Sequence, residues 1–208
     1  QLTRQLIRTL CASPTRDKLE RLMFGQLHPR NSIWWLEASD APGALQYLDT
    51  SQYSALISFR FLEAPYFQNL TGLSLIGEQM DSMRRSLDHG LEVLDIRGLH
   101  LASLRDYLQD SATISELRKL TLRNIKNPED LLRLLSDDYD GHLETLECSL
   151  TAYQRSHMLR QTSKKLQAAI CRSPLLESVD RLVLGSLFDV VDLDEIARHQ
   201  PHLEVVRE

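Results

Sequence analysis

The sequence predicts an α/β solenoid in which parallel strands line a concave face and helices cover the convex face. Three observations support this fold class: a short leucine-rich pattern recurs, each copy alternates apolar and polar residues, and helical spacing separates the copies. One strand–turn–helix unit cannot bury its own apolar side, so successive units must stack and share a core. Because 42% of the 208 residues are hydrophobic, we expect one continuous domain over residues 1–208.

The recurring pattern is an apolar residue, two free positions, an apolar residue, one free position and a third apolar residue. Successive copies begin 21 to 26 residues apart, except for one interval of 36 residues. Such spacing is typical of repeats that hold one strand and one helix each. The second and last copies are the poorest matches. The eight copies are LERLMF from Leu19, LQYLDT from Leu45, LTGLSL from Leu70, LEVLDI from Leu91, LRKLTL from Leu117, LETLEC from Leu143, VDRLVL from Val179 and LEVVRE from Leu203.

One longer internal match argues that these copies are not accidental. LCASPTRDKLERLMFGQL from Leu10 and ICRSPLLESVDRLVLGSL from Ile170 align without a gap at an offset of 160 residues. Cys, Ser-Pro, Arg-Leu, Gly and the final Leu coincide in the two segments. We therefore interpret them as two copies of one structural unit.

Alternation within a copy predicts a strand with one buried face. In the fifth copy, Leu120 and Leu122 point toward the core, whereas Lys119, Thr121 and Arg123 point away from it. The outward positions of all copies then lie side by side on the concave face.

Helical spacing follows several of the copies. SLRDYL after Leu101 and EDLLRLLS after Pro128 place apolar residues three and four positions apart. Asn127 before Pro128 and two acids is a helix-start signal, with Asn as the N-cap. Residues 151–170, inside the 36-residue interval, predict a longer amphipathic helix or a helix with a turn.

Two segments carry a resemblance to a known family. ICRSPLLESVDRLVLGSL from Ile170 and IARHQPHLEVV from Ile196 each end a helix with a short polar turn that contains Pro, and then enter a strand. This order resembles the roughly 26-residue repeat of F-box/leucine-rich-repeat proteins and their ribonuclease-inhibitor-like relatives. The sequence departs from that family after the strands, where many members carry Asn or Cys and this chain has Leu27, Leu99, Ile125, Leu150 and Leu187.

The resemblance implies that partner recognition and ligase recruitment belong to different segments of the protein. In such families the repeats select a protein partner, while a separate F-box recruits a ubiquitin-ligase scaffold. Residues 1–208 contain no F-box pattern, so a ligase role would require a further segment. The chain starts with Gln1 inside a helical pattern, and we expect it to be a piece of a longer protein.

The composition restricts the cellular compartment and the classes of partner that we expect. A net charge of -5 with 25% charged residues gives no global attraction to nucleic acid or anionic lipid. Three cysteines without a CxxC pair favour a reducing, intracellular compartment, cytoplasmic or nuclear. No apolar run reaches the roughly 18 residues that span a bilayer, so no membrane partner is expected. Asn69-Leu70-Thr71 matches a glycosylation acceptor, but we expect Leu70 to be buried.

The stronger motifs for catalysis and cofactor binding are absent from the sequence. The sequence lacks a glycine-rich phosphate loop, HExxH, GxSxG and CxxC, so we expect neither an enzyme nor a cofactor. His28, His89 and His100 lie near repeat boundaries, where solvated turn residues are the simpler interpretation.

One segment imitates a calcium-binding loop. SDDYDGHLETLE from Ser136 places acids at several EF-hand ligand positions, but its first position lacks a carboxylate. Leu143 to Cys148 also belongs to a predicted strand, where an EF-hand would begin its exiting helix. We interpret the segment as an acidic turn between a helix and a strand.

The outward strand positions are the expected binding surface, because they form a rigid array that the repeat does not need for packing. In the middle of this array a basic island lies between acidic neighbours, which suits a polar protein surface. The residues that we expect to contact a partner there are Asp95, Arg97, Lys119, Thr121, Arg123, Glu147 and Arg181.

Adjacent tryptophans add one more candidate. Trp34 and Trp35 cannot both face a core in regular structure, so we include Trp34 as an exposed contact residue. Other large side chains in connecting segments are assigned to the core instead: Tyr66, Phe67, Met80 and Met83.

The leading hypothesis is a protein–protein interaction scaffold that recognises a partner within a multi-subunit complex such as a ubiquitin ligase. Alternatives are a subunit of a nucleic-acid-associated complex that uses the basic island, and a GTPase-regulating repeat domain. Another protein is the expected partner, whereas a nucleic acid or a small molecule is not.

Overall fold

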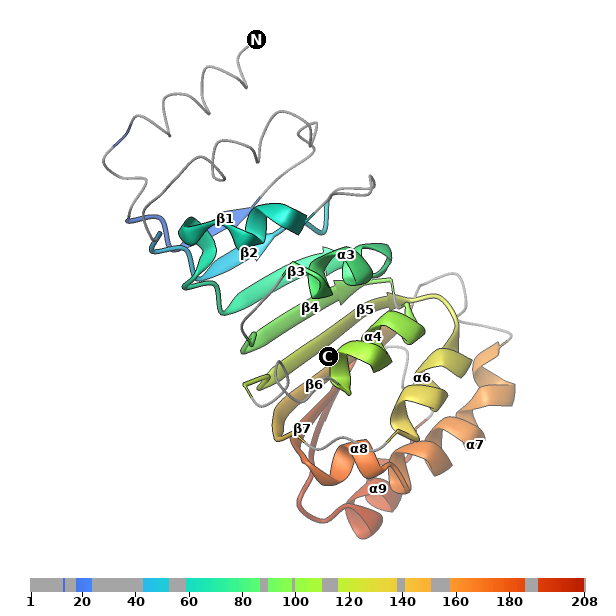
Figure 1. Cartoon of the computed structure of the whole chain (residues 1–208). Helices are drawn as coiled ribbons and strands as arrows, with labels where there is room; N and C mark the ends of the chain where they lie inside the picture. The colour runs from blue at the N-terminus through green and yellow to red at the C-terminus, as the bar shows by residue number, and fades with distance from the viewer. Residues whose placement is uncertain are drawn as a thin grey trace.

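Eight parallel strands form one open sheet whose spatial order equals the sequence order (Figure 1). The computed structural model describes residues 13, 18–23, 43–52, 59–86, 90–98, 100–109, 116–137, 141–150, 158–185 and 191–207. Each strand overlaps one of the eight sequence copies, including the two poorest matches, and β3 to β6 extend beyond the ends of theirs. The strands are β1 (Arg21–Met23), β2 (Tyr47–Asp49), β3 (Gly72–Ile76), β4 (Val93–Arg97), β5 (Lys119–Ile125), β6 (Leu143–Leu150), β7 (Val179–Leu184) and β8 (Glu204–Arg207).

Helices alternate with the strands and lie on one face of the sheet. Figure 1 is viewed from this side, where α3, α4 and α6 lie next to one another and are followed by α7, α8 and α9. Of the helices in the described residues, none combines the length and apolar character needed to cross a membrane. The helical segments are η3 (Phe59–Glu63), η4 (Pro65–Phe67), η5 (Gly77–Gln79), α3 (Met80–Arg84), α4 (Leu101–Leu108), α6 (Pro128–Leu135), α7 (Met158–Cys171), α8 (Pro174–Glu177) and α9 (Leu193–His199).

A row of leucines runs across the sheet and fixes its register. The central apolar residue of each copy pairs with the same residue of the next strand, as Leu94 does with Leu120 and Leu120 with Leu146. Adjacent strands are roughly 4.8 Å apart, so neighbouring leucines pack against one another. The predicted stacking is confirmed. The row contains Leu22, Leu48, Leu73, Leu94, Leu120, Leu146, Leu182 and Val205.

A second inward row packs against the helices. It contains Leu75, Ile96, Leu122, Cys148 and Leu184, none of which is more than 1% exposed. Buried helix residues complete this core, and the assignment of large side chains in the connecting segments to the core is confirmed. The helix and connector residues in it include Tyr66, Phe67, Met80, Met83, Leu104, Tyr107, Leu131, Leu134, Ile170 and Ile196.

Side-chain caps start two of the helices, α6 at the predicted Asn127 and α8 at Ser173. The side chain of Asn127 accepts a hydrogen bond from Glu129 N, with Pro128 in the first helical turn. Ser173 caps α8 in the same way through Leu176 N, and its hydroxyl also donates to Leu135 O at 2.6 Å. These caps satisfy amides that a helix start would otherwise leave unpaired.

The 36-residue interval holds an additional helix. The predicted longer helix over 151–170 corresponds to α7, and α8 follows it before β7 begins. Gln167 ties α7 to the start of α9, because its amide donates to Asp192 O at 3.0 Å and accepts from Asp192 N at 2.8 Å. The insertion therefore extends the helical layer without interrupting the sheet.

The fold makes a direct prediction for Leu120, which is fully buried between Leu94 and Leu146. Leu120→Ala should lower the free energy of unfolding by about 2–5 kcal/mol, because it removes buried methyl groups and leaves a cavity. Urea or guanidinium unfolding followed by circular dichroism measures this loss. Lys126→Ala, at an exposed position, is the control and should change stability by less than about 0.5 kcal/mol.

Candidate functional site

The candidate site lies on the sheet face opposite the helices, which we call the open face. Its side chains are the outward residues of β2 to β7, since strand residues alternate between the two faces. This is the face that the sequence predicts to be concave. The open-face residues used below are Tyr47, Asp49, Ser74, Asp95, Arg97, Lys119, Thr121, Arg123, Glu147, Arg181 and Val183.

Acids and hydroxyls alternate along the middle of the open face. The strand register places Asp49, Ser74, Asp95, Thr121 and Glu147 next to one another on five successive strands. The acids are thus two strand spacings apart, roughly 10 Å, with a small hydroxyl residue between them. We call these five residues the central row.

Basic side chains on either side of the central row pair with its acids. Arg123 Nε lies 3.1 Å from Asp95 Oδ2, and Arg123 Nη2 lies 3.8 Å from Glu147 Oε1. Lys119 Nζ lies 3.5 Å from Glu147 Oε2. The hydroxyl of Thr121 donates to Glu147 Oε2 at 3.4 Å. These contacts join five predicted contact residues into one network.

The network changes the interpretation of the predicted basic island. Lys119 and Arg123 are neutralised by Glu147 and Asp95, so the middle of the open face is a mixed network and not a patch of free positive charge. The basic heads remain accessible, because the side chains of Lys119 and Arg123 are 45% and 49% exposed. The acids lie deeper, at 16% for Asp95 and 20% for Glu147.

Thr121 is the predicted contact residue that the structure revises most. Its side chain belongs to the open face by register, but it is only 2% exposed. Ser74 is also 2% exposed, and Val183 is 6% exposed. Small residues in a closely spaced parallel sheet are covered by longer neighbours, so Thr121 supports Glu147 and has little surface to offer a partner.

Burial shifts the ionisation of Asp95. Desolvation raises the pKa of Asp95 above its ordinary value, although the charge of Arg123 and its hydrogen bond act in the opposite direction. Glu147 and Asp49 raise it further through like-charge repulsion. The central row therefore holds negative charge that is only partly compensated.

Two other predicted contact residues lie on the open face outside this network. Arg181 on β7 pairs with Glu204 of β8, with 3.6 Å between Nε and Oε2. Arg97 is the last residue of β4 and lies in register with Arg123 on β5. Its Nε is buried without a hydrogen-bond acceptor. Trp34 lies outside the described residues.

Tyr47 forms a platform at the other end of the open face that sequence reasoning missed. The Arg21 guanidinium lies 4.6 Å from the centroid of the Tyr47 ring. The ring also covers Gly72, since a Cβ at that glycine would clash with Tyr47 Cδ2. Burial raises the pKa of Tyr47, with Asp95 and Asp49 adding to the rise. The signal for this platform was the glycine that faces Tyr47 in the next copy.

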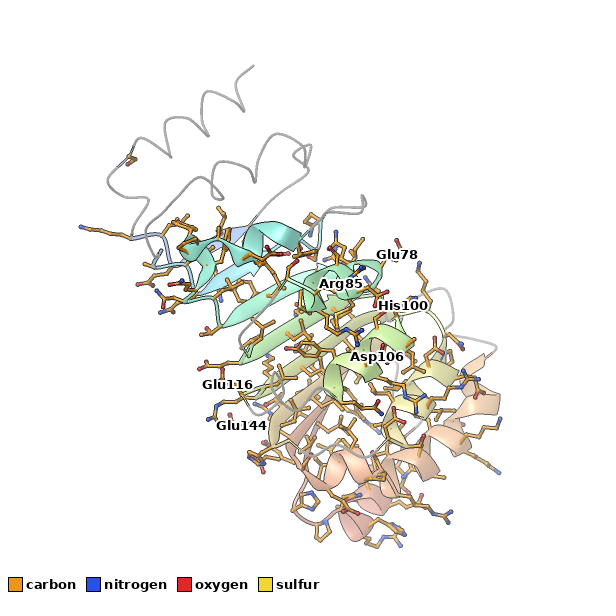
Figure 2. The ribbon with its side chains drawn as sticks, viewed as in Figure 1. Glu78, Arg85, His100, Asp106, Glu116 and Glu144 are labelled. Atoms are coloured by element: carbon orange, nitrogen blue, oxygen red, sulfur yellow. The ribbon has the colours of Figure 1, made fainter. Side chains whose placement is uncertain are left out.

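A polar groove of about 580 Å³ lies along the edge where the strands begin. Three carboxylates line it, from Glu20, Glu92 and Glu116, together with amide and hydroxyl side chains. Figure 2 shows Glu116 and Glu144 at this same edge of the sheet. Glu144 pairs with Arg118 at this edge, with 2.7 Å between Glu144 Oε1 and Arg118 Nη1.

Groups that could support catalysis or metal binding occupy structural positions. Cys148 is buried in the core, and burial raises its pKa to about 12, so its thiol stays protonated near neutral pH. His100 precedes α4, and its Nδ1 lies 2.7 Å from Ser103 Oγ. His28 and His89 lie outside the described residues. Within the described ranges, no group of three or more His, Cys, Asp or Glu side chains is arranged to hold a metal ion.

The segment that imitates a calcium loop runs into a strand. Leu143–Leu150 is β6, so the exiting helix of an EF-hand is replaced by sheet. Glu147, which would be the last calcium ligand, is bound to Lys119, Thr121 and Arg123 on the open face. The predicted turn between a helix and a strand agrees with the end of α6 and the start of β6.

Comparisons with protein-family models, curated proteins and solved structures found no match.

The pairing of Arg123 with Asp95 predicts a measurable pKa change. Arg123→Gln should raise the pKa of Asp95 further, because it removes a nearby positive charge and a charged hydrogen-bond donor. Carboxyl carbon NMR titration measures this shift, with Lys126→Gln as the matched control. An unchanged Asp95 titration in Arg123→Gln would contradict the pairing.

The sign of the stability effect follows from the raised pKa. Because the folded-state value of Asp95 lies above its unfolded value, its favourable contribution is complete below the unfolded pKa. That contribution is lost as the pH rises through the folded value. Unfolding curves between these two values should show this fall in the wild type, a larger fall in Arg123→Gln and a smaller one in Asp95→Asn.

Proposed function

We propose that the chain is a protein-binding solenoid built from leucine-rich repeats and that its open face receives the partner. The observation that carries this proposal is the network of Asp95, Lys119, Arg123 and Glu147, in which deep acids hold accessible basic heads in fixed positions. Such pre-ordered side chains lose little conformational freedom on binding, which favours recognition of a complementary surface.

The mixed charge supports a protein partner over a nucleic acid. A phosphate backbone is recognised by uninterrupted positive charge, whereas Asp95 and Glu147 place two carboxylates in the middle of this face. We propose that the domain selects a partner within an intracellular multi-subunit assembly, such as a ubiquitin ligase. The family resemblance supports that setting, and so do the buried free thiols of Cys148 and Cys171.

The proposal predicts that charge removal on the open face weakens partner binding. A triple variant of Lys119, Arg123 and Arg181 to Gln should raise the Kd roughly tenfold or more, because three accessible basic heads are lost. The partner would be recovered with the wild-type chain as bait, identified by mass spectrometry and then purified for titration calorimetry.

A control variant on the helical face matches this triple change. Substitution of Arg84, Arg105 and Lys165 by Gln also removes three positive charges, each of which is paired with an acid. Its Kd should stay near that of the wild type. An equal loss of binding in both variants, or unaltered binding in the open-face variant, would contradict the proposed surface.

A further inference from the structure

Arg97 differs from every other base on the open face. Arg21 lies over the Tyr47 ring, Lys119 and Arg123 contact acids of the central row, and Arg181 contacts Glu204. In the described part of the chain, Arg97 has no such partner, and its Nε is buried without a hydrogen-bond acceptor. Its guanidinium therefore has no counter-ion among the described residues.

No acid among the described residues pairs with Arg97. Arg97 and Arg123 lie next to each other on β4 and β5, so two like charges share one edge of the face. Asp95 and Glu147 already pair with Arg123 and Lys119, and no ion pair joins either acid to Arg97. Asp49 lies two strands from Asp95, and its Oδ1 accepts a hydrogen bond from Ser51 N at 2.8 Å.

We infer that Arg97 is the anchor for a carboxylate side chain, an Asp or Glu supplied by the partner protein. This inference rests on the proposed function and names the chemistry of the partner. A carboxylate fits because it is planar, carries one negative charge and can accept two hydrogen bonds from a guanidinium. One such group would give Arg97 a counter-ion, and it would relieve the repulsion between Arg97 and Arg123.

A single carboxylate fits this position better than a phosphate chain. A phosphodiester backbone would bring further negative charges over Asp95 and Glu147, which lie on the same face at about one strand spacing from Arg123. The partner segment is therefore expected to carry one acid flanked by uncharged residues.

The test is a titration of the ¹⁵N-labelled full chain with the peptide acetyl-Gly-Glu-Gly-amide, followed by NMR. The side-chain Nε–H signal of Arg97 should shift saturably, and the Gln form of the peptide should give no such shift. Arg97→Gln should lower the affinity, followed on the backbone amide of Gly98, by roughly tenfold or more. Arg84→Gln, on the helical face and paired with Asp106, should leave it unchanged.

The competing outcomes are distinguishable. Equal binding of the Gln peptide, or unchanged binding in Arg97→Gln, would overturn the inference. Tighter binding of inorganic phosphate or duplex DNA with a steep salt dependence would also overturn it. If Arg97 binds the peptide but the open-face triple variant still binds the purified partner normally, the proposed function fails and the carboxylate site stands. If the triple variant loses partner binding while the Arg97 Nε–H signal does not respond to the peptide, only the inference about Arg97 fails.

A loss of peptide binding in Arg97→Gln can be separated from a loss of stability. Arg97→Gln removes a charge that has no counter-ion and lies beside Arg123, so its melting temperature should equal or exceed that of the wild type. Arg97→Lys gives a second readout, because it keeps the charge but loses the planar donor pair. It should retain weaker peptide binding than the wild type and stronger binding than Arg97→Gln.

Discussion

The register of the buried leucine row governs the rest of this structure. A shift of one residue in any strand would exchange its inward and outward side chains. Because Leu94, Leu120 and Leu146 cannot leave the core without a large loss of apolar burial, that shift is excluded. The same constraint holds Asp95, Thr121 and Glu147 side by side, so the chemistry of the open face is positioned by residues that never reach solvent.

Close strand spacing explains why this polar face is partly buried. Side chains on neighbouring strands stand about 5 Å apart, so long residues cover short ones and lower the exposure of the acids between them. Individual ion pairs of this kind contribute only about 0.2–1 kcal/mol. The network of Asp95, Arg123, Glu147 and Lys119 is therefore more important for fixing side-chain positions than for overall stability.

Periodicity was sufficient to predict the sheet, because strand formation depends on apolar residues at fixed spacing. All eight copies became strands, and Asn127 capped the helix expected after it. The spacing of apolar residues does not predict which side chains contact or cover one another across strands. The burial of Thr121 and the position of the Tyr47 ring over Gly72 depend on neighbours contributed by other strands. The pairing of Lys119 and Arg123 with acids required three-dimensional register as well as charge.

Charges that serve only solubility do not need to be buried, and this distinguishes the central row from an ordinary charged surface. Asp95 is 16% exposed, and its raised pKa shows that desolvation outweighs the help from Arg123. A solvated Lys or Glu at that position would keep the sheet soluble at lower cost. Asp95 in that position orients Arg123, while none of the described acids pairs with the neighbouring Arg97. A face that orients one arginine and leaves its neighbour without a paired acid supports the proposal that it receives a group from another molecule.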